Sequence, residues 1–173
     1  NFSQYENVKS LKLSGIEVEA FQKRFYPLGE QASTLIGFSG KDGFGLEGLE
    51  TILDSELSGE AGEEIIFRNA SRRPQVSKEV VQGLNKKLTI DSRIQFYAYK
   101  HLSNYIQANN AKGGSAVVLD NISGEILAIA SYPSYNPNNP KRKIKRNRAL
   151  VDAYEPGSII KPLAAAKGID MGI

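Results

Sequence analysis

Ser158 and Lys161 are a nucleophile and a base that lie three residues apart near a predicted helix start. Residues with this spacing share one face of an α-helix, with Cβ atoms about 5–6 Å apart, so the lysine amine could reach the serine hydroxyl. A serine hydroxyl becomes a good nucleophile only when a base removes its proton, and a neutral lysine can be that base. The pair therefore indicates acyl transfer through a covalent serine intermediate.

The neighbouring sequence places Ser158 at the beginning of a helix. Pro156 and Gly157 interrupt the preceding segment and the run Leu163–Lys167 favours helix, so Ser158 is expected at the N-cap or in the first turn. There, unpaired backbone amides and the positive end of the helix dipole can stabilise a developing negative charge. On spacing alone, the commoner explanation is an N-capping serine beside a solvated lysine.

Motifs in the rest of the chain favour the catalytic interpretation. The segment Glu155–Pro162, preceded by Arg146–Ala149, resembles the nucleophile motif of penicillin-binding transpeptidases. Other segments match motifs of that family in the family's order, and together they cover most of the chain. The sequence therefore resembles the class B penicillin-binding proteins of the FtsI type. The matching segments are Arg24–Glu30, Leu35–Phe38, Asp42–Glu50, Leu88–Asp91 with Gln95, Gly114–Asp120, Gly124–Ala128 and Ser131–Asn139.

This resemblance implies a peptidoglycan D,D-transpeptidase of cell division, which crosslinks stem peptides at the septum and is a target of β-lactams. Ser158 would attack the penultimate D-alanine carbonyl of a stem peptide, or a β-lactam ring, and Lys161 would take its proton. The implied partners are the stem peptide, β-lactams, the FtsW-type glycan polymerase and other division proteins. The implied location is the periplasmic side of the bacterial inner membrane.

Other functions share part of this pattern. Elongation-type class B penicillin-binding proteins are the nearest alternative, and the segments Asn136–Asn139 and Arg146–Arg148 favour the division type over them. A pedestal that only binds partner proteins is a second alternative. A relative that hydrolyses or senses β-lactams would share the serine motif but not the N-terminal motifs.

The family's other catalytic motifs are expected downstream of the serine. An S-x-N motif and a K-[ST]-G strand follow the nucleophile in such enzymes. This sequence contains no K-[ST]-G, and Ser134–Asn136 fits S-x-N only in a loop that precedes the serine, which we interpret as coincidence. We therefore expect an N-terminal portion, truncated shortly after the serine motif and lacking its membrane anchor, that is catalytically inactive by itself.

Composition argues against several other chemistries. The 173 residues are 40% hydrophobic and 24% charged, as in ordinary folded domains, and no stretch approaches the roughly 18–20 apolar residues of a membrane span. There is no cysteine and His101 is the single histidine, so we expect no disulfide, no Ser-His-Asp triad, no metal and no cofactor. The basic run Lys141–Arg148 is expected to be a solvated loop, with binding to nucleic acid or to an anionic surface as the alternative. It has no interleaved aromatic residues for stacking, so nucleic acid is not an expected partner.

The expected fold class is α+β, with a division in the polar segment 76–87. Residues 1–82 are expected to form part of a non-catalytic pedestal domain. Residues 83–173 are expected to form the start of a transpeptidase α/β sandwich, consisting of its first helix, a hairpin and the nucleophile helix. Because the rest of such a sandwich would lie downstream, we expect the nucleophile helix to be exposed or disordered.

In the first part, the patterns predict two helices and a strand. The helices cover about Glu30–Leu35 and Gly45–Leu57, and the strand covers Glu64–Arg68. Arg24 is a candidate interdomain partner for an acidic side chain, with independent solvated charges as the alternative. The acidic candidates are Glu30, Glu47 and Glu50.

In the second part, a strand is predicted at Leu88–Ile90 and a capping box is formed by Ser92 and Gln95. A helix with one buried apolar face then ends at Asn109 and Asn110. Two largely buried strands form a hairpin after it. The apolar helix positions are Ile94, Ala98, Leu102, Tyr105 and Ile106, and the hairpin strands are Ala116–Leu119 and Ile126–Ile129.

Overall fold

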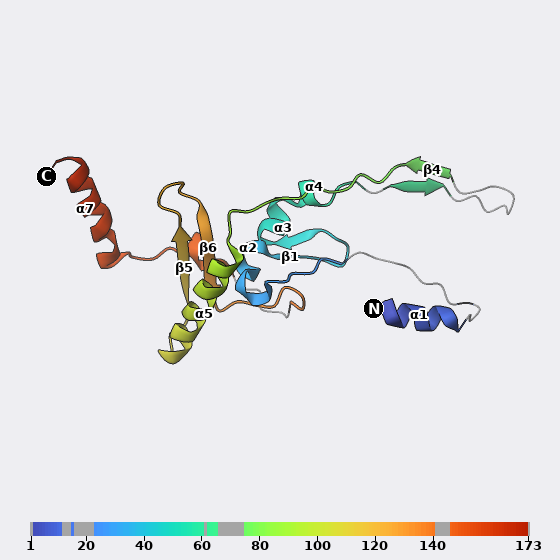
Figure 1. Cartoon of the computed structure of the whole chain (residues 1–173), viewed down its shortest axis with the longest axis horizontal. Coiled ribbons are helices and arrows are strands. Elements are labelled where there is room, and N and C mark those ends of the chain that lie inside the picture. The colour runs from blue at the N-terminus through green and yellow to red at the C-terminus, as the bar shows by residue number, and fades with distance from the viewer. Residues whose placement is uncertain are drawn as a thin grey trace.

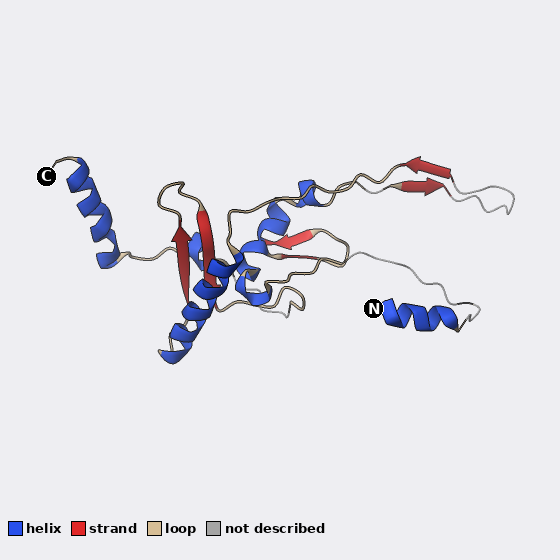
Figure 2. Cartoon of the chain, in the orientation of Figure 1, coloured by secondary structure: helices blue, strands red, loops and turns tan. Residues whose placement is uncertain are grey.

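The computed structural model describes residues 2–11, 15, 23–60, 62–65, 75–140 and 146–172. Figure 2 shows helices and short strands interspersed along this chain, which confirms the α+β expectation. In order, the elements are α1 (Phe2–Ser10), η1 (Gly29–Gln31), α2 (Ser33–Ile36), β1 (Phe38–Ser39), β2 (Gly45–Glu47), α3 (Gly48–Ile52), α4 (Asp54–Leu57), β3 (Glu63–Ile65), β4 (Gln75–Lys78), α5 (Ser92–Ala108), β5 (Gly114–Leu119), β6 (Ile126–Tyr132), α6 (Arg148–Val151), η2 (Gly157–Ile160) and α7 (Lys161–Asp170).

The centre of the molecule is the antiparallel hairpin of β5 and β6, with α5 packed across it (Figure 1). Its register runs from Gly114 opposite Tyr132 to Leu119 opposite Ile126, with a bulge near the far end. The hairpin is therefore confirmed. The expectation that both strands are largely buried holds for the middle of β6 but is wrong for β5. Alternate residues of β5 face solvent, because only one face of that strand is covered by α5.

Helix α5 begins with a cap that differs from the predicted one. The Asp91 carboxylate accepts backbone N–H bonds from Arg93 (2.8 Å) and Ile94 (3.1 Å), so Asp91 is the N-cap. These bonds, with that from Ile94 contributing most, hold the pKa of Asp91 below its usual value. The predicted capping box of Ser92 and Gln95 is wrong. The Gln95 side chain is fully buried and makes its hydrogen bonds to other elements.

The buried face of α5 is also more polar than the apolar pattern predicted. Gln95, Ser103 and Ile106 are the buried positions of the helix, and the first two carry polar side chains. Tyr105 is 70% exposed, so its assignment to the buried face is wrong, whereas that of Ile106 is confirmed. The helix ends where predicted, with Asn109 as its C-cap. The helix packs against β6 with a face displaced by about one residue from the predicted apolar face. Ile94, Ala98 and Leu102 of the predicted face therefore line an open groove.

The segment before α5 is extended but is not a strand, so the strand predicted at Leu88–Ile90 is wrong. Thr89 Oγ1 donates to the carbonyl of Ile126 (2.7 Å), and the Asp91 N–H donates to the carbonyl of Leu127 (2.9 Å). These bonds hold the segment beside the start of β6. One of them comes from a side chain, so the two do not form a backbone ladder.

Residues 23–57, which include η1, α2, β1, β2, α3 and α4, form a small layer, here called the N-terminal layer, that contacts α5 through η1 and β6 through α2. The helix predicted over Glu30–Leu35 is present as the short elements η1 and α2, separated at Ala32. The helix predicted from Gly45 is only partly right, because Gly45–Glu47 form strand β2 before α3 and α4 begin. These residues pair with β1, and Gly37, which has φ +81° just before β1, approaches the Glu47 carbonyl so closely that a Cβ would collide with it.

Strands β3 and β4 form a two-stranded antiparallel ribbon that extends away from the β5–β6 hairpin and α5 (Figure 1). The strand predicted over Glu64–Arg68 is confirmed at its start, and residues 66–68 lie outside the described residues. Lys78 Nζ lies 3.0 Å from Glu60 Oε2 at the base of the ribbon. Within the described part of the chain, the helices are too short or too polar to cross a membrane.

The aromatic core joins the two parts that the sequence separates. Tyr26 and Phe38 come from the N-terminal layer, and Tyr135 follows β6; all three are buried together. The Phe38 and Tyr135 rings meet edge to face, with centroids 5.9 Å apart and planes at 78°. The boundary between residues 82 and 83 remains a prediction, and this core packs across it.

The Tyr135 hydroxyl gives this core a measurable pH dependence. It donates to the Ser33 carbonyl (3.0 Å), and burial, with smaller contributions from the charges of Glu47 and Tyr26, raises the pKa of Tyr135 to about 12. An unfolded tyrosine ionises near pH 10. The folded state therefore holds the proton more tightly, and the resulting stability is complete below about pH 10 and is lost as the pH rises through about 12.

Tyr135→Phe is expected to lower the free energy of unfolding by about 1 kcal/mol at pH 7, because it removes one hydrogen bond and keeps the ring. The difference from wild type should shrink at pH 11, where only the wild type loses the tyrosine contribution. Urea unfolding at both pH values tests this, with Tyr105→Phe at a 70% exposed position as the control. If wild type and Tyr135→Phe differ in unfolding free energy by the same amount at pH 7 and pH 11, the raised pKa of Tyr135 is contradicted.

Candidate active site

Ser158 and Lys161 lie at the start of the last helix. Ser158 is in the 3₁₀ turn η2, and Lys161 is the first residue of α7, which continues directly from that turn. In a 3₁₀ turn, residues three apart stand nearly above one another, so both side chains leave the same side of the helix start. The N-cap that the sequence allowed for Ser158 is not formed, because Pro156 precedes the turn as its cap.

Both side chains are exposed to solvent. Figure 1 shows α7 standing apart from the β5–β6 hairpin at the end of an extended segment, as expected for an exposed nucleophile helix. Among the described residues, none donates to or accepts from the Ser158 hydroxyl. The predicted nucleophile and base therefore stand at a solvent-exposed helix start.

The segment that leads to the serine is fixed to the end of β6. The Ser131 hydroxyl accepts from the Arg148 N–H (3.0 Å) and donates to Asn147 Oδ1 (3.2 Å), and all of these atoms lie near the start of α6. Asp152 then binds Arg146 and, at 2.8 Å, Arg148 Nη1. The Arg146 hydrogen bond, followed by the charges of both arginines, keeps the pKa of Asp152 below its usual value. The approach to the nucleophile motif is thus attached to the central hairpin.

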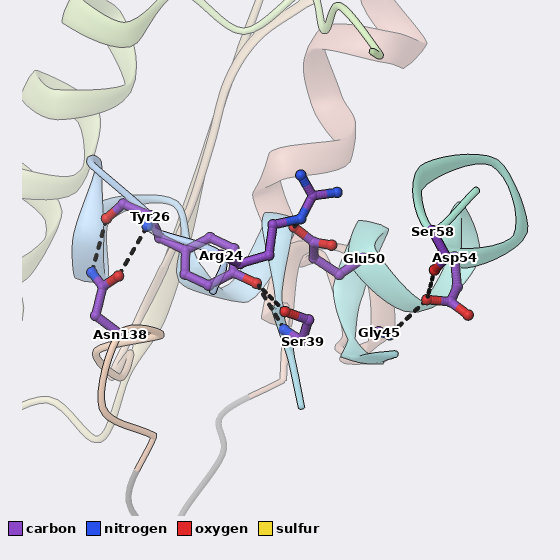
Figure 3. Close-up of polar contacts among 8 residues, drawn as sticks. All are labelled: Arg24, Tyr26, Ser39, Gly45, Glu50, Asp54, Ser58 and Asn138. Atoms are coloured by element: carbon purple, nitrogen blue, oxygen red, sulfur yellow. Dashed lines mark hydrogen bonds and ion pairs between the residues drawn. The ribbon is translucent and has the colours of Figure 1, made fainter. Parts of the chain in front are cut away.

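Of the acidic candidates for Arg24, the structure brings Glu50 to it. Arg24 Nε lies 3.4 Å from Glu50 Oε1, and the glutamate is buried (Figure 3). Glu30 instead accepts from the Tyr99 hydroxyl at 3.3 Å. Glu47 is exposed at the end of β2. Burial of the phenol is the main cause of the raised pKa of Tyr99.

The Arg24–Glu50 pair borders a cleft of about 470 Å³ in the N-terminal layer. Lys23 and Asp42 also line it, so charges of both signs face the opening. Asp54, on the same wall, is engaged with the Gly45 N–H (2.7 Å) and the Ser58 hydroxyl (3.0 Å), as Figure 3 shows. Within the described residues no group of acidic and histidine side chains forms a metal site.

Sequence reasoning missed two amide side chains that join the layers. Gln95 reaches the Gln31 carbonyl (2.6 Å) and both backbone groups of Ile129, whose N–H donates to Gln95 Oε1 at 2.8 Å. Asn138 binds the backbone of Tyr26. The signal available in the sequence was polarity on a helix face, because Gln95, Tyr99 and Ser103 recur every four residues.

Ser134–Asn136, the segment that fits S-x-N, is occupied by structural contacts. The Ser134 hydroxyl lies 2.7 Å from that of Tyr99, and Tyr135 is in the aromatic core. Asn136 Oδ1 accepts from the Asn138 N–H (2.9 Å) within the loop. These contacts agree with its interpretation as a coincidental match.

Two family models match the chain. The penicillin-binding protein dimerisation domain matches residues 2–88, and the penicillin-binding protein transpeptidase domain matches residues 114–173. The chain belongs to the penicillin-binding protein family. The recognition made from the motifs is thereby confirmed, and so is the architecture of a dimerisation-type domain followed by the beginning of a transpeptidase domain.

Relatives of this penicillin-binding protein carry consistent names. The chain is 41% identical over 182 residues to a protein from Neisseria gonorrhoeae named probable peptidoglycan D,D-transpeptidase PenA, covering 96% of this chain and 30% of the relative. It is 40% identical over 173 residues to the peptidoglycan D,D-transpeptidase FtsI of Escherichia coli K12, covering 96% of this chain and 29% of the relative. The chain thus spans about 30% of the length of these curated relatives.

Solved structures of the family have the same fold. The apo crystal structure of penicillin-binding protein 3 from Mycobacterium tuberculosis superposes with a TM-score of 0.74 at 35% identity, covering 91% of this chain and 34% of that one. A peptidoglycan synthetase from Bifidobacterium adolescentis superposes with a TM-score of 0.73 at 31% identity, covering 96% of this chain and 32% of that one.

Proposed function

We propose that the whole protein is a peptidoglycan D,D-transpeptidase in which Ser158 is the nucleophile and Lys161 its base. The observation that carries the proposal is the placement of this pair on one side of a helix start, inside the segment that matches the transpeptidase domain. No metal or cofactor takes part in the proposed chemistry.

In the proposed reaction, Ser158 Oγ attacks the penultimate D-alanine carbonyl of a stem peptide while Lys161 takes its proton. The tetrahedral intermediate collapses with cleavage of the peptide bond, and the terminal D-alanine leaves with a proton on its amine. An amine of a second stem peptide then attacks the acyl-serine ester, which forms the crosslink and returns the serine. A β-lactam would acylate the same oxygen by opening of its ring.

The sequence motifs resemble the FtsI type, which the resemblance implies is a division enzyme, and the 40% identity to a relative named FtsI supports this type. We therefore propose action at the septum, on the periplasmic side of the inner membrane, together with an FtsW-type glycan polymerase and other division proteins. An elongation-type enzyme is the second candidate, since the serine motif does not distinguish the two. Residues 1–82 would be the pedestal and 83–173 the start of the transpeptidase domain, with Arg24 and Glu50 bracing the pedestal near their junction.

We also propose that the 173-residue chain is inactive by itself. Ser158 and Lys161 are exposed, and neither residue lines the charged cleft beside Arg24 and Glu50 or the groove beside α5. Proximity of the two side chains would then act without a positioned substrate and without the complete oxyanion hole that enzymes of this kind use.

The experiment is intact mass spectrometry after incubation with a reactive penicillin, applied to the 173-residue chain and to the full-length protein, followed by peptide mapping. We expect a single adduct on the full-length protein, located on the peptide that carries Ser158, and none on the 173-residue chain. An adduct on another residue, or none on the full-length protein, would refute the nucleophile assignment. An adduct on the short chain would refute its inactivity.

A further inference from the structure

The Asn138 side chain pairs with the backbone of a residue 112 positions away. Its Oδ1 accepts from the Tyr26 N–H at 2.9 Å, and its Nδ2 donates to the Tyr26 carbonyl at 2.9 Å. Figure 3 shows both bonds on one edge of the amide. A primary amide offers a donor and an acceptor side by side, and here both bind the backbone of one residue, Tyr26.

The loop that carries Asn138, residues 133–139, is attached to the N-terminal layer at a second point. The Tyr135 hydroxyl donates to the Ser33 carbonyl (3.0 Å), while the ring fills the aromatic core against Phe38. The loop is internally braced, because the Asn138 N–H donates to Asn136 Oδ1 (2.9 Å). The loop therefore has an internal hydrogen bond and binds the backbone of the N-terminal layer at both Tyr26 and Ser33.

Strand β6, which precedes this loop, also contacts the segment that leads to Ser158. The loop continues directly from β6, whose Ser131 hydroxyl accepts from the Arg148 N–H at the start of α6. Arg148 in turn binds Asp152 at 2.8 Å, before the turn that holds Ser158. The end of β6 is thus connected on one side to the loop that binds the N-terminal layer and on the other to the segment that leads to Ser158.

We propose that Asn138 is a positioning residue that locks the N-terminal layer to the end of β6, so that the orientation of this layer is transmitted to the approach of Ser158. The lock consists of the two Asn138–Tyr26 hydrogen bonds. Its contribution to acylation rests on the proposed function, whereas the lock itself does not. Because the partner groups are backbone atoms, the lock depends on the amide of Asn138 and not on the side chain at position 26.

Three variants separate this role from simple space filling. Asn138→Ala removes both bonds. Asn138→Asp keeps the shape and the acceptor but replaces the donor with a second acceptor, which faces the Tyr26 carbonyl unfavourably. Asn139→Ala is the matched control, because the Asn139 side chain is exposed and makes no side-chain hydrogen bond among the described residues.

Hydrogen exchange of the 173-residue chain tests the lock. We expect amide exchange over residues 26–36 to become about tenfold faster or more in Asn138→Ala and Asn138→Asp, and to change less than twofold in Asn139→Ala. Exchange in Asn138→Asp that equals wild type would overturn the proposal, because shape alone would then suffice. Unchanged exchange in Asn138→Ala would overturn it as well.

Penicillin acylation of the full-length protein tests the positioning role. The acylation rate constant is expected to fall about five- to tenfold in both Asn138 variants and to stay within twofold in Asn139→Ala. The penicillin concentration that gives half of the maximal acylation rate is expected to be unchanged in all three variants. Faster exchange with an unchanged acylation rate would overturn the positioning role. If wild type is not acylated at all, the proposed function fails while the lock is still decided by exchange.

Discussion

Lys161→Ala in the full-length protein is expected to lower the rate constant for penicillin acylation of Ser158 about 10³-fold. A positioned general base typically contributes between 10² and 10⁴ to a rate, and a 10³-fold loss corresponds to about 4 kcal/mol of barrier. Lys161 follows the turn that holds Ser158 and leaves the helix on the same side, so alanine removes the nearest base on that turn. The remaining serine hydroxyl would have to lose its proton to water.

The measurement is stopped-flow acylation with a chromogenic cephalosporin, with circular dichroism to show that the variant is folded. Lys167→Ala is the matched control, since Lys167 is an exposed lysine on the same helix whose contact is with Asp170 at 3.4 Å. The control should acylate within twofold of wild type. A loss below tenfold for Lys161→Ala would show that another group is the base and that Lys161 is a solvated helix residue.

Gln95→Ala is expected to lower the free energy of unfolding of the 173-residue chain by about 3–5 kcal/mol. Gln95 is fully buried, and its amide satisfies the Gln31 carbonyl together with the N–H and carbonyl of Ile129. Alanine leaves these backbone groups without their partner and adds a cavity. A buried group that loses its hydrogen bond costs more than the bond itself contributes.

Urea unfolding measures the effect of Gln95→Ala, and two further variants separate the cost of the cavity from the cost of the lost hydrogen bonds and provide a surface control. Gln95→Met keeps much of the volume without the hydrogen bonds, so the difference between methionine and alanine reports the cavity. Asn104→Ala, at an exposed position on the same helix, should change the free energy of unfolding by less than about 0.5 kcal/mol. If Gln95→Ala costs less than about 1 kcal/mol, water or a rearranged loop must replace the amide.

The sequence by itself determined the features that depend on nearby residues. Ser158 and Lys161 were found from a spacing of three and the helix-favouring run after them, and η2 and α7 lie there. The β5–β6 hairpin was predicted from two apolar runs around a turn, because a hairpin is set by short-range pattern and turn residues. The end of α5 was marked by asparagines. Motif order likewise identified the family, since it needs no knowledge of how the segments pack.

Only the tertiary structure decided how the layers are joined. Gln95 looked like half of a capping box, but its amide is drawn into the interior by backbone groups of Gln31 and Ile129 that lie far away in the sequence. Asn138 likewise finds the backbone of Tyr26. Backbone donors and acceptors are the same in every residue and leave no mark in a sequence, so the partner of a buried amide is fixed only when folding brings a particular peptide group within hydrogen-bonding distance.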